Sequence, residues 1–294
     1  MRRIPLRRRR LIGALKRLRL DAGLTIAQLA ELADFSPSKL SRIEAFEIGI
    51  NGDDTLILCE AMNAEDAVSD AMVRLARQAR RKDWWQVYPD DVLGRFVDYM
   101  ELEDDSRTVR NFQIDLIPGL LQTPSYIEAL IRQGWPNEKD ESIDQRVKLR
   151  IDRQERALHR MPLWFVIDEA ALRRPLGSPE VMAEQLSHLI FMAREAGVTI
   201  QILPTDISGH MALGVPFILN ELKDGSCYVY LDTLTGGLYV EELEEVFRYR
   251  DAWERLSATA LDFDRSVAMI RRYVKQHRSA SDAAPVAEGQ LQQR

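Results

Sequence analysis

Apolar residues at the start of this chain recur at helical intervals. Within residues 11–18 a leucine appears every three or four positions, which places these side chains on one face of a helix that ends before Gly23. The same spacing returns over residues 26–33 and predicts a second, shorter helix, with Thr25 available to cap its start. The chain is therefore expected to begin with two amphipathic helices.

A third short helix is predicted to begin at Pro37. Ser36 can cap it, and proline suits the first helical position because its missing N–H would have no partner there. Leu40 and Ile43 define the buried side of this helix. The opposite side carries small and basic residues, which are Ser38, Ser41, Arg42 and Ala45, with Lys39 beside them.

The second and third helices are separated by a turn of three to four residues, at which Asp34 can adopt a positive φ. On its own, an exposed face of this composition would be an ordinary solvated surface. In a helix-turn-helix arrangement, however, a second helix with a small and basic face is suited to the major groove of DNA. The sequence therefore predicts a DNA-binding module.

Residues 23–46 resemble the helix-turn-helix of the Xre family, the fold of phage repressors. The resemblance implies that Pro37, Ser38 and Arg42 contact base edges and that Lys39 contacts phosphate. It departs from the family at Ile26, where glutamine is common and contacts DNA.

The resemblance also implies an internal ion pair between Arg19 and Glu44, which would pack the first helix against the recognition helix. A second departure is Asp34, which stands where glycine is common. Aspartate remains sterically acceptable at such a turn.

Positive charge is concentrated at the amino terminus. Nine basic residues precede the first acid, Asp21, and residues 1–44 have a net charge of +7, whereas the whole chain has −6 and the remainder −13. We expect the arginine run to form an arm that follows phosphates or enters the minor groove, although it could also be a solvated tail in the free protein. The predicted DNA-binding residues are Arg7, Arg8, Arg9, Arg10, Ser36, Pro37, Ser38, Lys39, Ser41 and Arg42.

The length of 294 residues suits two domains. We expect a DNA-binding domain over residues 1–80, a second domain over 81–278 and a disordered tail over 279–294. No apolar run approaches the roughly 18 to 20 residues needed to span a bilayer, so a cytoplasmic protein is expected. Cys59 and Cys227 lie far apart in no metal-binding motif, and packing roles are expected for both.

The periodicity changes in the second half of the chain. The apolar runs 163–167 and 198–203 are typical of buried strands, and the segment 180–196 between them has helical spacing, so a βαβ unit is predicted. Two further runs flank the turn residues 223–226 and predict a hairpin. Helices are predicted over about 92–160, with a break at 116–124, and then over 240–260 and 266–277.

The predicted fold class is α+β. An all-α, lambda-repressor-like helix-turn-helix domain is followed by a mixed α/β domain with a small sheet of four to five strands.

Several ordered motifs of the second half resemble the carboxy-terminal domain of Xre-type regulators of the WhiJ kind. The motifs are WW at 84–85, IPGLLQT at 117–123, VIDEAALRRPLG at 166–177, VTIQILP at 198–204, GH at 209–210 and PF at 216–217. The resemblance implies a transcriptional regulator linked to development and specialised metabolism. It also implies a small partner protein, in an arrangement resembling antitoxin and toxin.

The sequence argues against an enzyme. The four histidines are too dispersed for a metal site, and neither a GxSxG elbow nor a P-loop occurs, so we expect no catalytic residue, metal or cofactor. Asp168 and Glu169 could suggest acid–base chemistry, but adjacent residues at a strand end point in different directions. One of them is expected to cap the next helix.

We therefore expect a sequence-specific DNA-binding regulator whose second domain senses a small molecule or docks a small protein. The alternative is an antitoxin-like protein that mainly neutralises its partner. Candidates for ligand contact are Trp84, Trp85 and His210. A homodimer is expected, because one recognition helix covers only a few base pairs.

Overall fold

The computed structural model describes residues 4–207 and 209–291 of the chain. It divides into two compact units, Met1–Val87 and Tyr88–Arg294, which are described separately below. Residues 81–87, which we assigned to the second domain, lie in the first unit.

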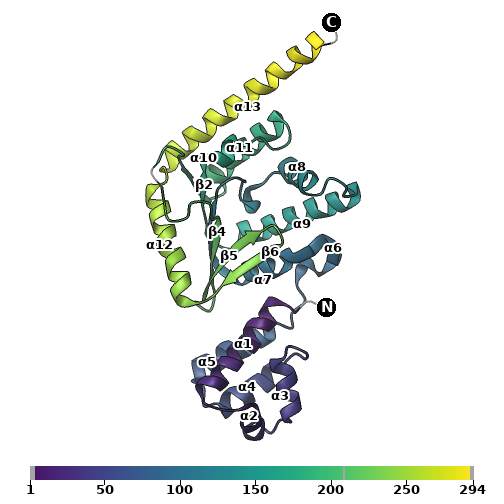
Figure 1. The fold of residues 1–294 in the computed structure, drawn as a ribbon, viewed down its shortest axis with the longest axis vertical. Helices are drawn as coiled ribbons and strands as arrows, with labels where there is room; N and C mark the ends of the chain where they lie inside the picture. Colours follow the sequence, from purple (N-terminus) through teal and green to yellow (C-terminus); the bar gives the residue numbers. More distant parts are fainter. Residues whose placement is uncertain (1–3, 208, 292–294) are drawn as a thin grey trace. The chain divides into compact units, whose positions relative to one another are not determined.

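From residue 4 onward, the first unit contains helices and no strand, as predicted (Figure 1). Its helices are α1 (Leu6–Asp21), α2 (Ile26–Leu32), α3 (Pro37–Glu44), α4 (Gly52–Ala61) and α5 (Asp66–Gln78), followed by the 3-10 turn η1 (Trp84–Val87).

Local capping explains where the central helices begin. The Thr25 hydroxyl accepts a hydrogen bond from the Gln28 backbone, and the Gln28 side chain accepts one from the Thr25 backbone, which closes a capping box at α2. Ser36 caps α3 by accepting from the Lys39 N–H at 3.2 Å. Asp34 has a φ of 54°, as predicted, and Gly23, directly after the first helix, has a φ of 70°.

The core of the first unit joins all five helices. Leu11 of α1, Leu29 of α2, Leu40 of α3 and Leu58 of α4 are almost completely buried in one cluster. Cys59 is fully buried in the same cluster and free, consistent with a packing role.

The second unit contains helices and a mixed sheet. Its helices are α6 (Asp90–Leu93), α7 (Val97–Asp105), α8 (Pro124–Gly134), α9 (Asp140–Leu158), α10 (Glu169–Arg173), α11 (Pro179–Glu195), α12 (Leu243–Thr259) and α13 (Phe263–Leu291), with 3-10 turns η2 (Gly94–Phe96) and η3 (Gly119–Leu121). Its strands are β1 (Ser106–Gln113), β2 (Leu163–Asp168), β3 (Thr199–Leu203), β4 (Phe217–Leu222), β5 (Cys227–Thr233) and β6 (Gly236–Val240).

The strands of the described residues form one sheet in the order β3-β2-β1-β4-β5-β6. β1, β2 and β3 are parallel neighbours, and the connection from β2 through α10 and α11 to β3 is the predicted βαβ unit. β4 and β5 form the predicted antiparallel hairpin. β1 pairs antiparallel with β4 and so joins the two halves of the sheet.

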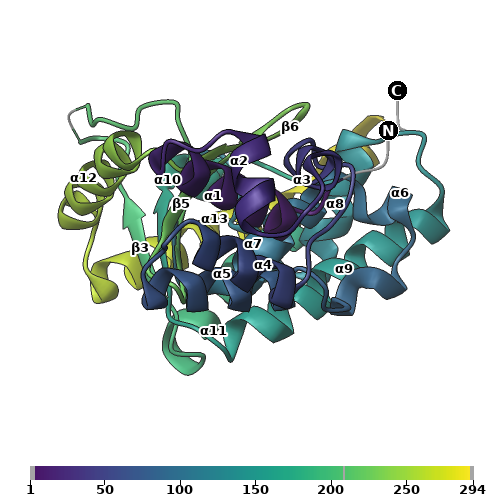
Figure 2. The same cartoon turned by 90° about the horizontal axis from the view of Figure 1, so that it is seen from below.

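Helices cover both faces of this sheet. α12 packs on one face, where its Val246, Trp253 and Leu256 join a buried cluster with Phe112 and Val166. Figures 1 and 2 show α8, α9 and α11 on the opposite side of the sheet from α12. The six strands found over the described ranges exceed the four to five that we expected.

Two strands fall outside the sequence expectation. β1 lies where a helix was predicted, because its buried apolar residues Val109 and Phe112 are three positions apart, a spacing that also fits a helix. β6 begins with two glycines and keeps Leu238 exposed at the sheet edge, so it has neither the composition nor the burial of a recognisable strand.

The carboxy terminus also differs from the expectation. α13 continues to Leu291, where a disordered tail was expected from residue 279. Four alanines between residues 280 and 287 favour helix extension, whereas Pro285 and Gly289 in the same segment oppose it. Within the described part of the chain, no helix is long and apolar enough to cross a membrane.

Candidate nucleic-acid interface

The outer face of α3 has the composition that the sequence predicted. Ser38, Ser41 and Arg42 are exposed, whereas Leu40 and Ile43 are only 2% and 1% exposed and anchor the helix in the core. Pro37 is exposed at the first position of the helix. The helix therefore presents a small, basic and accessible surface.

Lys39 occupies the edge of this face and is held from two sides. Its Nζ lies 2.9 Å from Asp54 Oδ2, at the start of α4, and 3.7 Å from the centroid of the Phe35 ring. A DNA phosphate would have to compete with the Asp54 carboxylate for this ammonium group. Sequence analysis did not identify Asp54, although an acid in the first turn of the following helix was a visible signal.

Arg42 also has an acidic neighbour within the first unit. Its Nε lies 3.2 Å from Glu47 Oε2, and the two side chains are 56% and 60% exposed. Glu47 was missed as well. It stands five residues after Arg42, just beyond the end of α3, where sequence alone does not specify the direction of the chain.

The arginines of the expected arm lie in the first turns of α1 and not in an extended segment. Arg7 is buried, and its Nη1 lies 2.5 Å from Asp83 Oδ1. Arg8 donates from Nη2 to the carbonyl oxygen of Phe46 at 2.9 Å. Arg10 is 9% exposed and Arg9 is half-buried.

These four residues therefore belong to a helix and not to an extended arm, and their contact with DNA stays a prediction. Helix α1 already begins at Leu6, and the charged groups of Arg7 and Arg8 bind acceptors of their own unit. The other two arginines of the predicted arm, Arg2 and Arg3, lie outside the described residues.

Arg19 and Glu44 form the internal pair that the family resemblance implied. Two hydrogen bonds join them, at 2.6 Å from Nε to Oε1 and at 2.9 Å from Nη2 to Oε2. The hydrogen bond to Glu44 raises the pKa of Arg19, against the opposing effect of burial. Ile26 is partly buried against the core, and its side chain has no polar group.

The candidates for ligand contact do not form one site within either unit. Trp84 and Trp85 belong to the first unit, where their rings meet edge to face at 5.4 Å and Trp85 is 2% exposed. His210 belongs to the second unit, where its Nδ1 accepts from the Ala212 N–H at 3.3 Å and its ring meets Phe112 at 5.6 Å. Each has a local packing or turn role.

The second unit also has an open groove of about 470 Å³ beside β3. Its lining includes Trp164, Val198, Gln201 and Phe263. The indole N–H of Trp164 donates to Gln201 Oε1 at 2.8 Å, and the Gln201 amide donates to the carbonyl oxygens of Ser257 and Leu261. The polar groups of the groove's Trp164 and Gln201 are thus already used within the protein.

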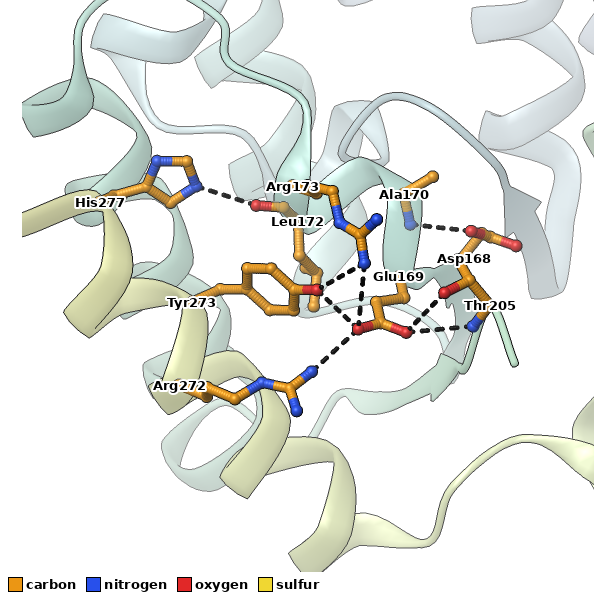
Figure 3. Close-up of polar contacts among 9 residues, drawn as sticks. All are labelled: Asp168, Glu169, Ala170, Leu172, Arg173, Thr205, Arg272, Tyr273 and His277. Atoms are coloured by element: carbon orange, nitrogen blue, oxygen red, sulfur yellow. Dashed lines mark hydrogen bonds and ion pairs between the residues drawn. The ribbon is translucent and has the colours of Figure 1, made fainter. Parts of the chain in front are cut away.

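Asp168 and Glu169 have separate structural roles (Figure 3). Asp168 caps α10 by accepting from the Ala170 N–H at 2.8 Å, as predicted for one member of this pair. Glu169 is buried and accepts hydrogen bonds from the Thr205 N–H and hydroxyl, both at 3.0 Å, from the Tyr273 hydroxyl at 2.6 Å and from Arg272 Nη2 at 2.9 Å.

This set of bonds joins α10 to α13 and to the segment after β3. Burial opposes ionisation of Glu169, but the bonds from Tyr273 and Thr205 and the charge of Arg272 outweigh it and hold the pKa of this carboxyl below its ordinary value. His277 adds a bond from Nε2 to the Leu172 carbonyl oxygen at 3.0 Å. Glu169 therefore anchors α13 to α10.

Residues 96–272 match the family described as a domain of unknown function, DUF5753. The match covers more than half of the chain. The chain belongs to the DUF5753 family. The DUF5753 region contains the six-stranded sheet, the helices α7 to α12 and the start of α13 as far as Arg272.

A helix-turn-helix domain family matches residues 10–72, which include α2 and α3. The amino-terminal part of this DUF5753 protein is thus a helix-turn-helix domain. This finding supports the interpretation of the protein as a DNA-binding regulator. No curated protein and no solved structure matches the chain. In the region that the structure describes, no group of three or more His, Cys, Asp or Glu residues is placed to hold a metal ion.

Proposed function

We propose that this protein is a sequence-specific transcriptional regulator of the Xre type, related to regulators of the WhiJ kind, and that it reads DNA with α3. The observation that carries this proposal is the exposed face of Ser38, Ser41 and Arg42 on the second helix of a helix-turn-helix domain. Such a helix lies in the major groove, where its exposed side chains can contact the base edges.

Arg42 is the residue best suited to base recognition. Arginine most often reads guanine, by donating two hydrogen bonds to O6 and N7. The hydroxyls of Ser38 and Ser41 can donate to or accept from either base of a pair. Lys39 would contribute a phosphate contact once released from Asp54, and such contacts set the position of the helix without reading sequence.

The test is selection from a pool of random DNA duplexes with the full-length protein. We expect one recurring site to be enriched. On that site, Arg42→Ala should weaken binding by roughly 1 to 3 kcal/mol and relax the preference at one base pair.

Arg74→Ala is the matched control, since it removes the same charge from an exposed position on α5. Full affinity and unchanged preference in Arg42→Ala would refute this role for Arg42. Failure of the wild-type protein to enrich any duplex would refute DNA recognition altogether.

For the DUF5753 domain, the proposal is docking of a small protein partner. Leu243 and Phe247 are 87% and 69% exposed and lie one turn apart at the start of α12, so they form one apolar strip. Four exposed acids flank the strip, namely Glu241, Glu242, Glu244 and Glu245, of which Glu244 lies 3.4 Å from the exposed Arg248. By charge complementarity, the partner would present a basic segment with apolar side chains of its own.

The competing role is sensing of a small molecule in the groove beside β3. That groove is open, and its central amide and indole are already bonded to each other. An enclosed apolar pocket with free polar groups would be more usual for a small ligand. Docking also suits the antitoxin-like alternative, in which the partner is neutralised. No catalytic role is proposed for the domain.

Native mass spectrometry of the full-length protein, purified from its own cells, can separate the two roles. We expect a retained polypeptide whose sequence contains a basic amphipathic segment. The recombinant partner should then bind the wild-type protein and lose affinity for Phe247→Ser, but not for the control Phe191→Ser on α11, which is 56% exposed. A retained metabolite, or equal binding to both variants, would contradict the docking surface.

A further inference from the structure

The chain reverses direction immediately after the recognition helix. Phe46 has a φ of 61°, in the left-handed region that residues other than glycine rarely adopt. The Phe46 N–H donates to the Ile43 carbonyl oxygen at 2.9 Å, and the Glu47 N–H donates back to the Arg42 carbonyl oxygen at 2.9 Å. The turn therefore places Glu47 directly beside Arg42.

A residue from α1 holds this turn in place. Arg8 Nη2 donates to the Phe46 carbonyl oxygen at 2.9 Å. A residue other than glycine keeps a positive φ only where its surroundings fix the backbone, and a charge-assisted hydrogen bond of this kind does so. The backbone at Glu47 is thus held by the fold of the unit.

The pair between Arg42 and Glu47 uses one nitrogen of the guanidinium group. Glu47 Oε2 lies 3.2 Å from Nε. Within residues 4–207 and 209–291, no hydrogen bond involves Nη1 or Nη2 of Arg42. The two nitrogens that can together donate to guanine O6 and N7 therefore remain available while the third is held.

We propose that Glu47 is a positioning residue that gives Arg42 its selectivity for a base over the phosphate backbone. This proposal rests on the function proposed above and deepens it. By holding Nε, Glu47 fixes the plane of the guanidinium fork and directs its end for bidentate contact. By its negative charge, it also opposes a close approach of phosphate to the same arginine.

Glu47 should have two effects on DNA binding, one common to any acid on the surface and one specific to its contact with Arg42. Loss of an acid anywhere in the unit raises affinity for all DNA, because it reduces repulsion of the polyanion. Loss of Glu47 should also raise affinity for all DNA. In addition it should free Arg42 to bind phosphate, so that affinity rises more for random DNA than for the selected site.

The experiment compares Glu47→Gln with Glu31→Gln, which removes the same charge from an exposed position on α2. Dissociation constants are measured for the selected site and for a random duplex of equal length, with full-length protein at fixed salt. We expect Glu47→Gln to lower the ratio of specific to random affinity by about fivefold or more, the low end of what one base contact contributes. Glu31→Gln should leave the ratio unchanged.

A double-variant cycle then tests whether the effect passes through Arg42. In an Arg42→Ala background, Glu47→Gln should no longer change the ratio, whereas a purely structural role of Glu47 would still lower it. The melting temperature of Glu47→Gln should stay close to that of the wild type, since an exposed pair stabilises a protein little.

Each outcome decides the proposal. An unchanged ratio in Glu47→Gln, or an equal effect with and without Arg42, overturns the role of Glu47 and leaves DNA recognition by α3 standing. Absence of any site-specific binding by the wild-type protein overturns the proposed function and this inference together.

Discussion

Arg19 and Glu44 are joined by two parallel hydrogen bonds that tie the middle of the DNA-binding unit together. Arg19 also donates from Nη1 to the Leu24 carbonyl oxygen at 2.7 Å, so one guanidinium group connects α1, the turn before α2 and the end of α3. Both side chains are at most 10% exposed. The orientation of the recognition helix therefore depends on a buried ion pair.

We expect Arg19→Ala to reduce the free energy of unfolding of the first unit by about 3 to 5 kcal/mol, because the buried Glu44 carboxylate would lose its partner. Arg19→Lys should also destabilise it, since an ammonium group cannot form the bidentate pair. Chemical denaturation followed by circular dichroism measures both. The exposed control Arg74→Ala should change stability by less than about 0.5 kcal/mol. Equal losses in the variants and the control would contradict a structural role for the pair.

Arg7 should act on folding and not on DNA. Because it is buried against Asp83, Arg7→Ala should lower thermal stability and leave the salt dependence of binding to random DNA unchanged. A lost phosphate contact would instead reduce the slope of log K against log salt by about 0.9. Asp83→Asn should reproduce the loss of stability. A slope reduced by this amount in Arg7→Ala would show that the arginine leaves Asp83 to bind phosphate.

The ionised Glu169 carboxylate should make the stability of the second unit depend on pH. Its folded pKa lies below the ordinary value of 4.5, so the carboxylate stabilises the fold at a pH above 4.5 and loses this effect as the pH falls through the folded pKa. Glu169→Gln should cost about 1.5 to 3 kcal/mol at neutral pH, the scale of hydrogen bonds to a charged group. The difference from the wild type should shrink below pH 4.5.

Urea unfolding of the full-length protein at a series of pH values measures this difference. The control Glu155→Gln, at an exposed position of α9, should stay close to the wild type throughout. A difference between Glu169→Gln and the wild type that is independent of pH would exclude the ionised carboxylate as its source.

The protein should bind DNA as a homodimer. Two recognition helices related by two-fold symmetry and spaced by about 34 to 36 Å read a near-palindromic site. Light scattering should therefore give twice the chain mass of 33.8 kDa. Most of the interface is expected in the second unit, so a fragment of residues 88–294 should dimerise and one of residues 1–87 should not. A monomeric full-length protein that protects a single half-site would defeat the dimer.

The sequence predicted the DNA-binding unit in most respects because its signals are local. Caps, turn residues and helical spacing act within a few positions, and Thr25, Ser36 and Gly23 all have the predicted roles. The roles of Arg7 and Arg8 could not be predicted, since their partners Asp83 and Phe46 are distant in sequence. A run of arginines indicates positive charge but does not indicate whether an acceptor in the same unit binds it.

The sheet was harder to predict than the helices. β2 and β3 are apolar runs and were recognised, whereas β1 has a buried Asn111 and a fully buried Ser106, which give it a polar composition. Its strand character comes from pairing on both sides, with β2 and with β4. Such pairing depends on residues more than 50 positions away and has no local signature.

The central place of β1 has a consequence for the order in which the chain folds during synthesis. The helical first unit depends on nearby contacts and can fold as soon as it leaves the ribosome. β1 leaves early as well, but its antiparallel partner β4 begins only at Phe217, about a hundred residues later. A nascent chain would therefore carry a folded first unit for many seconds while the edge of β1 that pairs with β4 has no partner. An unpaired strand edge can pair with the wrong strand, so this is the stage at which the growing protein is most exposed to mispairing.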